Sequence, residues 1–414
     1  MKVTTMRRVD RWIGVPACAA LTLLRRLGAP FSRRDPGQPP KRIAIVKLAE
    51  QGATVLAYPA LVRAAEMVGR ENLFFLVFSQ NRFILDLLDV VPKENVIAIR
   101  TNGMVTVVLD TLRAVMRMRR LGIDAAVDFE FFARSSAILT YLSGARMRVG
   151  YHAYHGEASY RGDLMTHRLS FNPLQHASQM FDILVRSLEQ PPGRFPACDI
   201  EPPAITDGPM PVYRSAPARI EEVEAILRET LGVQQIPPIL LLNANCSDLL
   251  PLRRWPTVRY AELTRRLLES HSELAVVFTG SPDEAADARE LVGDVSSARC
   301  VSLAGRTTME QLIALYELSD LMVTNDSGPA QYATLTSIDV ITIFGPETPA
   351  VFGARSSRSH ILWAGIACSP CVNGFNDRQS ACRDNLCMQK ISVDEVFDLA
   401  SRVLRERSER RGQD

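Results

Sequence analysis

The stretch DLMVTNDSGPAQYATLTSIDVITIFG, residues 320–345, decides the fold class of this chain. Two apolar runs, 320–326 and 339–345, have the length and composition of buried strands, and a Ser-Gly-Pro turn opens a helical run between them. Strands that are apolar on both faces and alternate with helices form parallel sheets that helices cover on both sides. The stretch therefore predicts an α/β fold.

The same alternation of apolar strands and amphipathic helices extends through most of the 414 residues. It fades between about residues 172 and 238, where eight prolines fall from 191 to 217, and this interval predicts a domain boundary. We therefore expect two doubly wound Rossmann-like domains, which bind ligands at the carboxyl ends of their strands, facing the cleft between them. The other expected strands are 43–48, 73–78, 95–99, 124–129, 238–244, 274–280 and 300–305, and the expected helices include 54–68, 105–121, 257–270 and 393–407.

Four segments are expected along the chain. They are a basic amphipathic helix with a linker at 1–40, an N-terminal Rossmann-like domain at 41–205, a C-terminal one at 235–390, and a helix and tail at 391–414. Residues 1–42 hold ten Lys and Arg against two acidic residues, whereas the formal net charge of the whole chain is only +2. This uneven distribution favours contact of the N-terminal segment with an anionic surface.

The apolar run WIGVPACAALTLL, residues 12–24, is too short to span a bilayer as a helix, which needs roughly 20 apolar residues. Arginines stand at both of its ends, as in a helix that lies at the membrane interface. We interpret the run as an interfacial helix on an anionic membrane. A helix packed on the protein's own surface and a signal peptide are the alternatives.

The small net charge argues against a dedicated nucleic-acid-binding protein, which carries a concentrated basic excess. A chain of this length needs no disulfide framework, so a reducing cytoplasmic setting is expected for its eight cysteines. Four of them form a C-x₂-C-x₁₀-C-x₄-C pattern that can hold zinc tetrahedrally. A structural zinc site, two disulfides and four free thiols remain open for Cys368, Cys371, Cys382 and Cys387.

The segment VTNDSGPAQYA, residues 323–333, is the sharpest local signal of a binding site. Asp326 ends a buried strand, and Ser327 and Gly328 open the next helix, where a ligand can approach the backbone closely. Free N–H groups at a helix N-terminus can bind a diphosphate. A well-capped helix without a ligand is the plain alternative.

Two weaker signals accompany this segment. Gly52 follows the first expected strand, where a glycine admits either a substrate or a tight turn. Arg253, in the LRRWP segment 252–256, has a planar guanidinium that can pair with phosphate oxygens, or it is a solvated surface arginine.

These segments occur in a fixed order with Thr279-Gly280, LAGRTTMEQL (303–312), FGPETP (344–349) and RSSAILTYLSGARMRVGY (134–151). Taken together, they resemble glycosyltransferase family 9, the heptosyltransferase-like enzymes of bacterial lipopolysaccharide assembly. The resemblance runs from about residue 41 to residue 404. The resemblance implies a GT-B fold, with the acceptor on the domain at 41–205 and a nucleotide-sugar donor on the domain at 235–390.

The resemblance further implies an inverting transfer, without metal or other catalytic cofactor, of a heptose or similar sugar to a lipid-linked glycan of the lipopolysaccharide type. A base deprotonates the acceptor hydroxyl, which attacks the anomeric carbon. Backbone N–H groups and a cation stabilise the departing diphosphate. Such an enzyme would lie at the cytoplasmic face of the inner membrane.

Arg253, Asp326, Ser327 and Gly328 match positions that act on the donor in the family. The expected donor-binding residues are Gly52, Thr279, Gly280, Thr307, Met309, Asp326, Ser327, Gly328, Gln331 and Glu347. For an anionic acceptor, His155 or Arg161 in the segment 150–167 is the candidate, against the alternative of ordinary surface residues.

Three positions depart from the family pattern. The Gly-Asp pair that carries the presumed base becomes Gly52-Ala53, and Glu50 is the candidate replacement. The histidine of the Gly-Pro-Met-His pattern becomes Gln331, and the lysine before the Trp-Pro pair becomes Arg253. Two other functions therefore stay open: a sugar-nucleotide or glycan-binding protein that has lost the base, and a sugar-nucleotide epimerase on the same fold.

Overall fold

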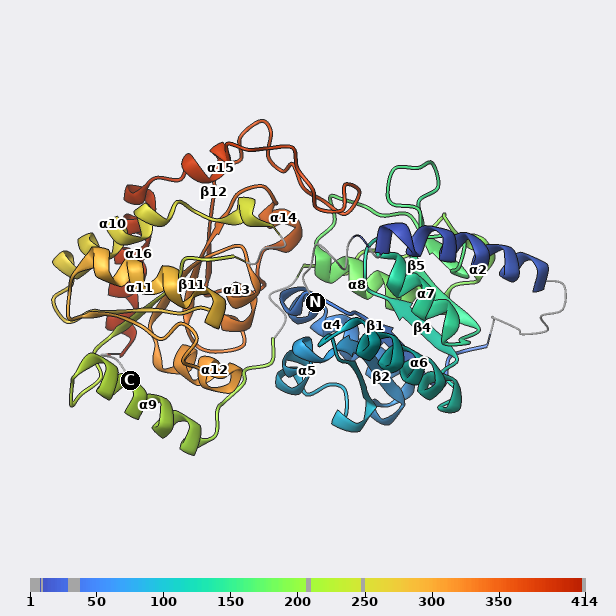
Figure 1. Ribbon diagram of the computed structural model, residues 1–414, viewed down its shortest axis with the longest axis horizontal. Coiled ribbons are helices and arrows are strands. Elements are labelled where there is room, and N and C mark those ends of the chain that lie inside the picture. The colour runs from blue at the N-terminus through green and yellow to red at the C-terminus, as the bar shows by residue number, and fades with distance from the viewer. Residues whose placement is uncertain (1–7, 9, 29–37, 206–209, 247–249, 412–414) are drawn as a thin grey trace. The chain divides into compact units, whose positions relative to one another are not determined.

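The computed structural model describes residues 8, 10–28, 38–205, 210–246 and 250–411. The chain divides into two compact units (Figure 1). Unit 1 consists of Met1–Ile205 and Val372–Gln379, and unit 2 of Thr206–Cys371 and Ser380–Asp414. Each unit is built on a six-stranded sheet whose neighbouring strands are parallel.

The sheet of unit 1 has the strand order β3-β2-β1-β4-β5-β6. Its order reverses at β1, because β2 and β3 lie on one side of β1 and β4 to β6 on the other. The loops that follow β1 and β4 therefore diverge at a topological switch point. The strands are β1 (Ile43–Val46), β2 (Leu73–Phe78), β3 (Val96–Ile99), β4 (Ala125–Asp128), β5 (Met147–Tyr151) and β6 (His167–Leu169).

Helices cover both faces of this sheet (Figure 1). On one face, α6 (Met104–Arg120) and α7 (Arg134–Leu142) bury Met118 and Leu139 against alternate side chains of the strands, such as Val46. On the other face lie α4 (Tyr58–Val68) and α8 (Ala177–Arg186). The short helices of this unit are α3 (Gln51–Leu56) and α5 (Phe83–Leu88).

The N-terminal helix α2 (Gly14–Gly28) packs against α7, with Cys18 fully buried. Thr22 Oγ1 accepts a hydrogen bond from the backbone N–H of Asp163 at 2.9 Å, and the Arg25 guanidinium pairs with the Asp163 carboxylate. This helix is therefore part of unit 1 rather than a separate segment. No helix in the described residues is both long enough and apolar enough to cross a membrane.

Unit 2 repeats the same architecture with the strand order β12-β11-β10-β7-β8-β9, and its switch point lies between β7 and β10. The helices α10 (Thr257–Ser270), α11 (Ala285–Val295) and α16 (Val393–Arg411) lie on one face of its sheet. The helix α12 (Met309–Leu318) packs on both α9 (Pro217–Leu231) and α13 (Gly328–Ala333). The strands are β7 (Ile239–Asn243), β8 (Ala275–Phe278), β9 (Cys300–Ser302), β10 (Leu321–Asn325), β11 (Asp339–Phe344) and β12 (Ser359–Trp363).

Each expected strand contains an observed strand, and the predicted α/β fold class is confirmed. The expected helix 54–68 is two helices, α3 and α4, which meet at Ala57. Most of the proposed linker at 31–40 lies outside the described residues. Two further short helices among the described residues are α14 (Pro349–Phe352) and α15 (Leu386–Gln389).

Residues 372–379 belong to unit 1, although the sequence placed them inside the C-terminal domain. Phe375 explains the difference, because its ring lies 5.1 Å from the ring of Phe171 and 6.1 Å from that of Phe132. Phe375 is partly buried, and packing of its ring against other aromatic rings favours the contact of this short segment with unit 1. The apolar contact that decides this placement joins residues about two hundred positions apart.

Candidate active site

A cluster of charged side chains occupies the switch point of unit 1. Val46 pairs with Asp128 in the sheet, so the residues that follow β1 and β4 emerge at the same edge. Lys47 Nζ lies 3.2 Å from Glu50 Oε2 and 3.1 Å from Glu130 Oε2. Burial acts to lower the pKa of Lys47, but the Glu130 and Glu50 carboxylates outweigh it, so the pKa lies above its ordinary value. Lys47 is therefore a buried cation between two carboxylates.

Glu130 holds the loop that carries Glu50. Its Oε1 atom accepts hydrogen bonds from the backbone N–H groups of Leu48 at 2.8 Å and Ala49 at 3.1 Å. With Oε2 on Lys47, both of its carboxylate oxygens are engaged in the protein. No motif in the sequence pointed to Glu130, although its place just after the strand next to β1 was a usable signal.

Glu50 is the more open carboxylate of the cluster, with 22% of its side chain exposed. Its backbone φ is 65°, a left-handed conformation that costs a non-glycine residue about 1 kcal/mol and recurs at functional sites. Arg378 pairs with Oε1, and its guanidinium lies 5.7 Å from the ring centre of Phe131. Two cations thus stabilise the ionised carboxylate of Glu50, which is the form that can accept a proton.

Arg161 does not face a solvent-accessible acceptor site, contrary to the expectation from the sequence. Only 2% of its side chain is exposed, and its guanidinium pairs with Asp128 and donates to the Phe131 carbonyl oxygen at 2.6 Å. Asp128 also accepts a hydrogen bond from Ser136 Oγ at 2.9 Å, and burial raises the pKa of its carboxyl to about 6. Arg161 therefore balances a buried charge. His155 is exposed, and its role as an acceptor-binding residue stays a prediction.

The switch point of unit 2 is organised by the side chain of Asn325, the last residue of β10. Asn325 Oδ1 accepts a hydrogen bond from the backbone N–H of Trp255 at 2.9 Å. Asn325 Nδ2 donates to the backbone carbonyl oxygens of Ala244 at 3.0 Å and Asn245 at 3.1 Å. These bonds fix the loop after β7 and the start of α10 to the end of β10. The same loop carries Arg253 to this edge of the sheet.

Arg253 lies between two buried carboxylates. Its Nη1 atom is 3.7 Å from Asp326 Oδ2 and 3.6 Å from Glu347 Oε2. Both distances exceed hydrogen-bond range, so the ion pairs attract the guanidinium without using up its N–H donors. Arg253 Nε is buried and has no hydrogen-bond partner within the described residues. This arrangement leaves the guanidinium able to bind an anion.

Three further polar atoms at this edge are buried and unpaired within the described part of the chain: Asn245 Oδ1, Thr279 Oγ1 and Gln331 Oε1. An unsatisfied buried polar atom costs about 1–3 kcal/mol, so such atoms are rare away from ligand sites. They follow β7, β8 and β10, the strands nearest the switch point. The edge therefore has the polar groups to bind hydroxyl and amine groups of a ligand.

The helix that Ser327 and Gly328 open is only six residues long. The Ser327 side chain makes no capping hydrogen bond, and a Cβ at position 328 would lie 2.4 Å from the Tyr332 hydroxyl. A side chain at position 328 would therefore force the Tyr332 ring to shift. A helix this short offers local N–H groups to a phosphate rather than a full helix dipole.

The other predicted donor residues lie at the ends of strands or at the starts of helices. Gly52 is buried in α3 of unit 1, whereas Glu347 follows β11 in unit 2. Thr307 and Met309 flank Thr308, the N-cap of α12, and Gly280 follows β8. In unit 2 all of them lie toward the carboxyl edge of the sheet, and their contact with a donor stays a prediction.

The four clustered cysteines lie in the loop after β12 and in α15, and Cys368, Cys382 and Cys387 are free thiols. Ser380 Oγ donates to Cys371 Sγ at 3.2 Å, and the Asn385 N–H donates to Cys382 Sγ at 3.4 Å. Burial raises the pKa of the Cys387 thiol. Within the described residues, no His, Cys, Asp or Glu group has the geometry to hold a metal ion. The structural zinc stays a prediction.

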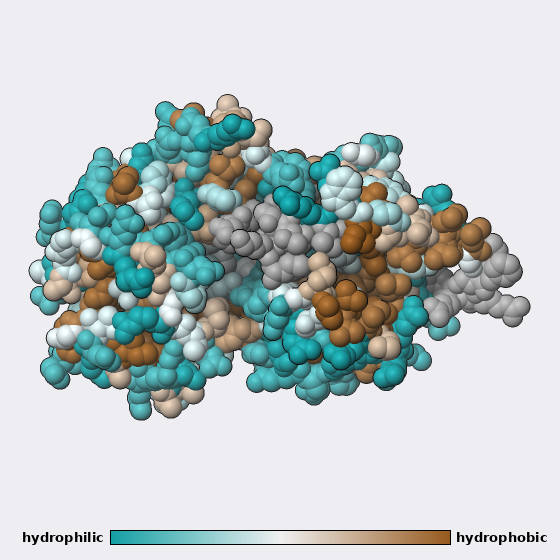
Figure 2. Space-filling view, viewed as in Figure 1, coloured by the Kyte–Doolittle hydropathy of each residue, from teal (hydrophilic) through white to brown (hydrophobic). Residues whose placement is uncertain are grey.

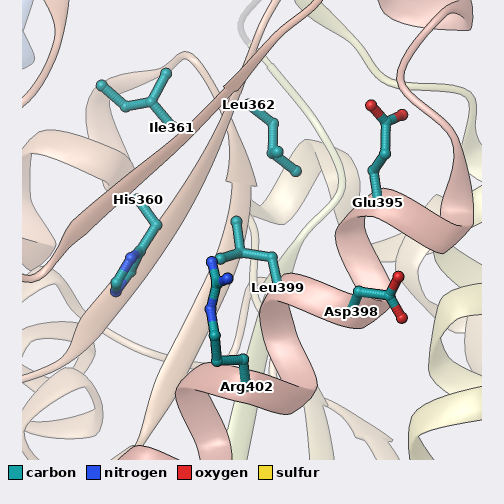
Figure 3. Close-up of a pocket in the computed structure, with 7 residues that line it drawn as sticks. All are labelled: His360, Ile361, Leu362, Glu395, Asp398, Leu399 and Arg402. Atoms are coloured by element: carbon teal, nitrogen blue, oxygen red, sulfur yellow. The ribbon is translucent and has the colours of Figure 1, made fainter.

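A surface hollow of about 400 Å³ lies elsewhere in unit 2, between β12 and α16 (Figure 3). The carboxylates of Glu395 and Asp398 point in different directions and do not converge with His360 on one point (Figure 3). The hollow lies beside an edge strand rather than at the switch point. The edge with Arg253 is therefore the better candidate site, because it gathers convergent, buried polar groups.

Residues 212–380 match the family model described as glycosyltransferase family 9 (heptosyltransferase). This region is a glycosyltransferase family 9 domain. The predicted family is thereby confirmed, and the match contains Arg253, Asp326, Gln331 and Glu347.

A curated relative supports the same assignment. The chain is 30% identical over 115 residues to lipopolysaccharide heptosyltransferase 2 of Salmonella typhimurium. The aligned residues make up 27% of this chain and 32% of that protein. The match thus spans about a third of the length of the relative.

Solved structures extend the likeness to nearly the whole chain. The structure of the Escherichia coli ADP-heptose LPS heptosyltransferase II has a TM-score of 0.63 at 16% identity and covers 88% of this chain and 99% of that one. The structure of a family 9 glycosyltransferase from Veillonella parvula has a TM-score of 0.68 at 15% identity, and the match covers 90% of this chain and 100% of that one. At these identities the likeness shows the fold, and the predicted two-domain GT-B-like fold is confirmed.

Proposed function

We propose that this protein is an inverting glycosyltransferase that transfers a heptose or similar sugar from a nucleotide-sugar to a lipid-linked glycan of the lipopolysaccharide type. The observation that carries the proposal is Arg253, a cation with only 12% of its side chain exposed, held beyond hydrogen-bond range of Asp326 and Glu347. A guanidinium in such a place binds a diphosphate, and carboxylates beside it accept hydrogen bonds from sugar hydroxyls. The names of the relatives, which are heptosyltransferases, agree with this chemistry.

In the proposed reaction, Glu50 takes the proton of the acceptor hydroxyl as its oxygen attacks the anomeric carbon of the donor. A new glycosidic C–O bond forms while the C–O bond to the diphosphate breaks, with inversion at that carbon. The electron pair leaves with the nucleoside diphosphate, whose extra charge Arg253 stabilises. No metal ion is required in this scheme, because the Arg253 guanidinium stabilises the charge of the departing diphosphate.

The surroundings of Glu50 support its role. Glu130 binds the backbone on the N-terminal side of Glu50, and Lys47 and Arg378 hold the two carboxylate oxygens in one orientation. The cations also stabilise the anionic state in which Glu50 begins the reaction. We assign Glu130, Lys47 and Arg378 as positioning residues.

The proposed setting is the cytoplasmic face of the inner membrane, with α2 near the lipid that carries the acceptor. A structural zinc ion on Cys368, Cys371, Cys382 and Cys387 is proposed as a separate stabilising feature. Zinc content of the purified protein, measured by atomic emission before and after mild chelation, tests this feature independently of transfer.

Calorimetric titration with ADP-, UDP-, GDP- and dTDP-sugars, with and without EDTA, tests the donor site. One nucleotide class should bind, EDTA should not change its affinity, and Arg253→Ala should weaken it by about tenfold or more, because charge-assisted bonds to the diphosphate are lost. Arg265→Ala, which removes an exposed arginine of α10, is the matched control. Absence of binding for all four classes would refute the donor site.

One second function has an observation in its favour. Ala53 replaces the acidic residue of the family pattern, and both oxygens of Glu50 are already paired with cations. A sugar-nucleotide-binding protein without turnover would have these features. Binding of the donor without any transfer to lipopolysaccharide core acceptors by the wild-type protein would favour this function over transfer.

A further inference from the structure

Helix α6 of unit 1 exposes an apolar stripe that no described element covers. Val105 is 73% exposed, and Leu109, Leu112 and Met116 are each about half exposed. These residues recur at intervals of four and three, so they share one side of the helix. The opposite side, with Ala114 and Met118, packs into the core of the sheet. The stripe is therefore turned away from the fold rather than left by loose packing.

Helix α2 exposes a second apolar surface on the same unit. Its buried side packs on α7 through Cys18, whereas Leu23, Leu24 and Leu27 are each about 60% exposed. Helix α6 also contacts α7, because Arg119 Nε donates to the Leu142 carbonyl oxygen at 2.7 Å. Both helices thus flank α7, and Figure 2 shows hydrophobic side chains gathered over α2 and α6 on the viewed face.

The charged side chains that α6 and α2 themselves expose are positive, although Arg25 of α2 also pairs with Asp163. Helix α6 carries four arginines, Arg113, Arg117, Arg119 and Arg120, all of them exposed. Its one acidic residue, Asp110, is buried, and hydrogen bonds from Arg100 hold the pKa of that carboxyl far below its ordinary value. Helix α2 has Arg25 and Arg26 in its last turn and no acidic residue. Neither helix presents an exposed carboxylate.

We propose that α6 and α2 together form a docking face for the surface of an anionic lipid bilayer. Exposed apolar side chains enter the interface between headgroups and acyl chains, and arginines beside them pair with lipid phosphates. The proposal adds α6 to the membrane contact of α2 in the proposed function, and it does not depend on which sugar is transferred. The absence of acidic residues from both exposed surfaces favours an anionic bilayer over a protein partner, which would offer mixed charges.

The test is partition of the full chain onto vesicles of phosphatidylethanolamine with phosphatidylglycerol and onto vesicles of phosphatidylcholine alone. The wild type should bind the anionic vesicles more tightly, with an affinity that falls as salt is added. The double variant Val105→Glu, Leu112→Glu on α6 should lose about tenfold or more of that affinity, as should Leu23→Glu, Leu27→Glu on α2. Glutamate places a charge in the interface and repels anionic headgroups.

Leu174→Glu is the matched control. Leu174 is 86% exposed in the same unit and precedes α8, on the opposite face of the sheet, so this variant should bind vesicles as the wild type does. Donor affinity, measured by calorimetry, should be unchanged in all of these variants, which separates this proposal from the proposed function. Thermal unfolding checks that each variant folds, and exposed positions should tolerate the change.

Two results would overturn the proposal. The first is equal vesicle affinity for the α6 variant and the wild type. The second is a change from dimer to monomer in the α6 variant, seen by light scattering, without a loss of vesicle binding, which would show that the stripe binds a second copy of the chain.

Discussion

Ala53 leaves the start of α3 without a carboxylate, and Glu50 supplies one three residues earlier in the chain. We predict that Glu50→Gln lowers kcat by about a hundredfold or more, because the amide has the size of the carboxylate but cannot accept the proton. Donor affinity should stay unchanged. Initial-rate kinetics and calorimetry measure the two quantities.

Glu66→Gln, an exposed substitution in α4, is the matched control for this change and should leave both quantities at the wild-type level. Turnover retained in Glu50→Gln would assign the base to another residue. A wild type that binds donor but shows no turnover would instead support the binding-protein function.

His167 is buried in β6, and its Nε2 atom donates to the Gln190 carbonyl oxygen at 3.1 Å. Burial lowers the pKa of its imidazole from 6.5 to about 4. Because the folded state resists protonation, this histidine contributes stability that is present above pH 6.5 and is lost as the pH falls toward 4. The full effect is about 3 kcal/mol.

His167→Gln should therefore lose less stability than the wild type between pH 6.5 and pH 4. Asp128, whose pKa is raised, acts in the opposite direction over much of this range, so the difference between variant and wild type is the quantity to measure. Urea unfolding at several pH values gives it. His155→Gln, at an exposed position, should follow the wild type, and parallel curves for His167→Gln would contradict the assignment.

At the scale of elements, the segment 372–379 links the aromatic cluster of unit 1 to the charged cluster. Phe375 packs on Phe171 and Phe132, and three residues later Arg378 pairs with Glu50. We predict that Phe375→Ala loosens the segment and lowers kcat by about tenfold, because Arg378 no longer orients Glu50. Donor affinity should not change.

Hydrogen exchange over residues 372–379 checks the mechanism of that loss, since it should become faster in Phe375→Ala. Gln379→Ala, an exposed change at the end of the same segment, serves as its control. Slower turnover without faster exchange would show that Phe375 acts by another route.

Helix α2 shows how one helix can serve the fold and a surface at the same time. Gly162 adopts a φ of +73°, and a Cβ there would lie 2.8 Å from the Cys18 carbonyl oxygen, so a glycine lets the helix approach this closely. The packed side of α2 is thus fixed by close backbone contact. Its other side is left free for the lipid contact proposed above.

At the scale of the whole molecule, the two units carry different parts of the proposed chemistry. Arg253 and Asp326 belong to unit 2, whereas Glu50 belongs to unit 1. We predict that the nucleoside diphosphate selected by calorimetry slows hydrogen exchange at residues 243–246, 250–256 and 325–331, because a ligand stabilises the native state where it binds. The loop 47–52 should exchange at an unchanged rate.

Exchange measured by mass spectrometry, with Arg253→Ala at the same nucleotide concentration as the control, tests this division. Protection centred on 47–52 would contradict the assignment of the donor to unit 2. Equal protection in Arg253→Ala would show that the nucleotide binds at another place.

Much of the fold could be predicted from the sequence because buried parallel strands are encoded locally. The run 73–78 is apolar at every position, the run 339–344 is buried at every position, and the short turns between elements restrict the topology. The same locality explains why Arg253 and Asp326 could be named as candidates: each lies in a short motif beside an expected strand or helix.

The sequence alone determined the α/β class, the order of strands and helices and the family, and it named Arg253 and Asp326 as candidates for the donor site, since all of these rest on short segments. Only the tertiary structure decided that Arg378 pairs with Glu50, 328 positions away, that Glu130 holds the Glu50 loop, and that Arg161 is buried against Asp128. These pairings join segments that are distant in the chain, and they exist because folding buries charges, each of which then requires a partner of opposite sign. No local pattern of residues specifies which partner that is.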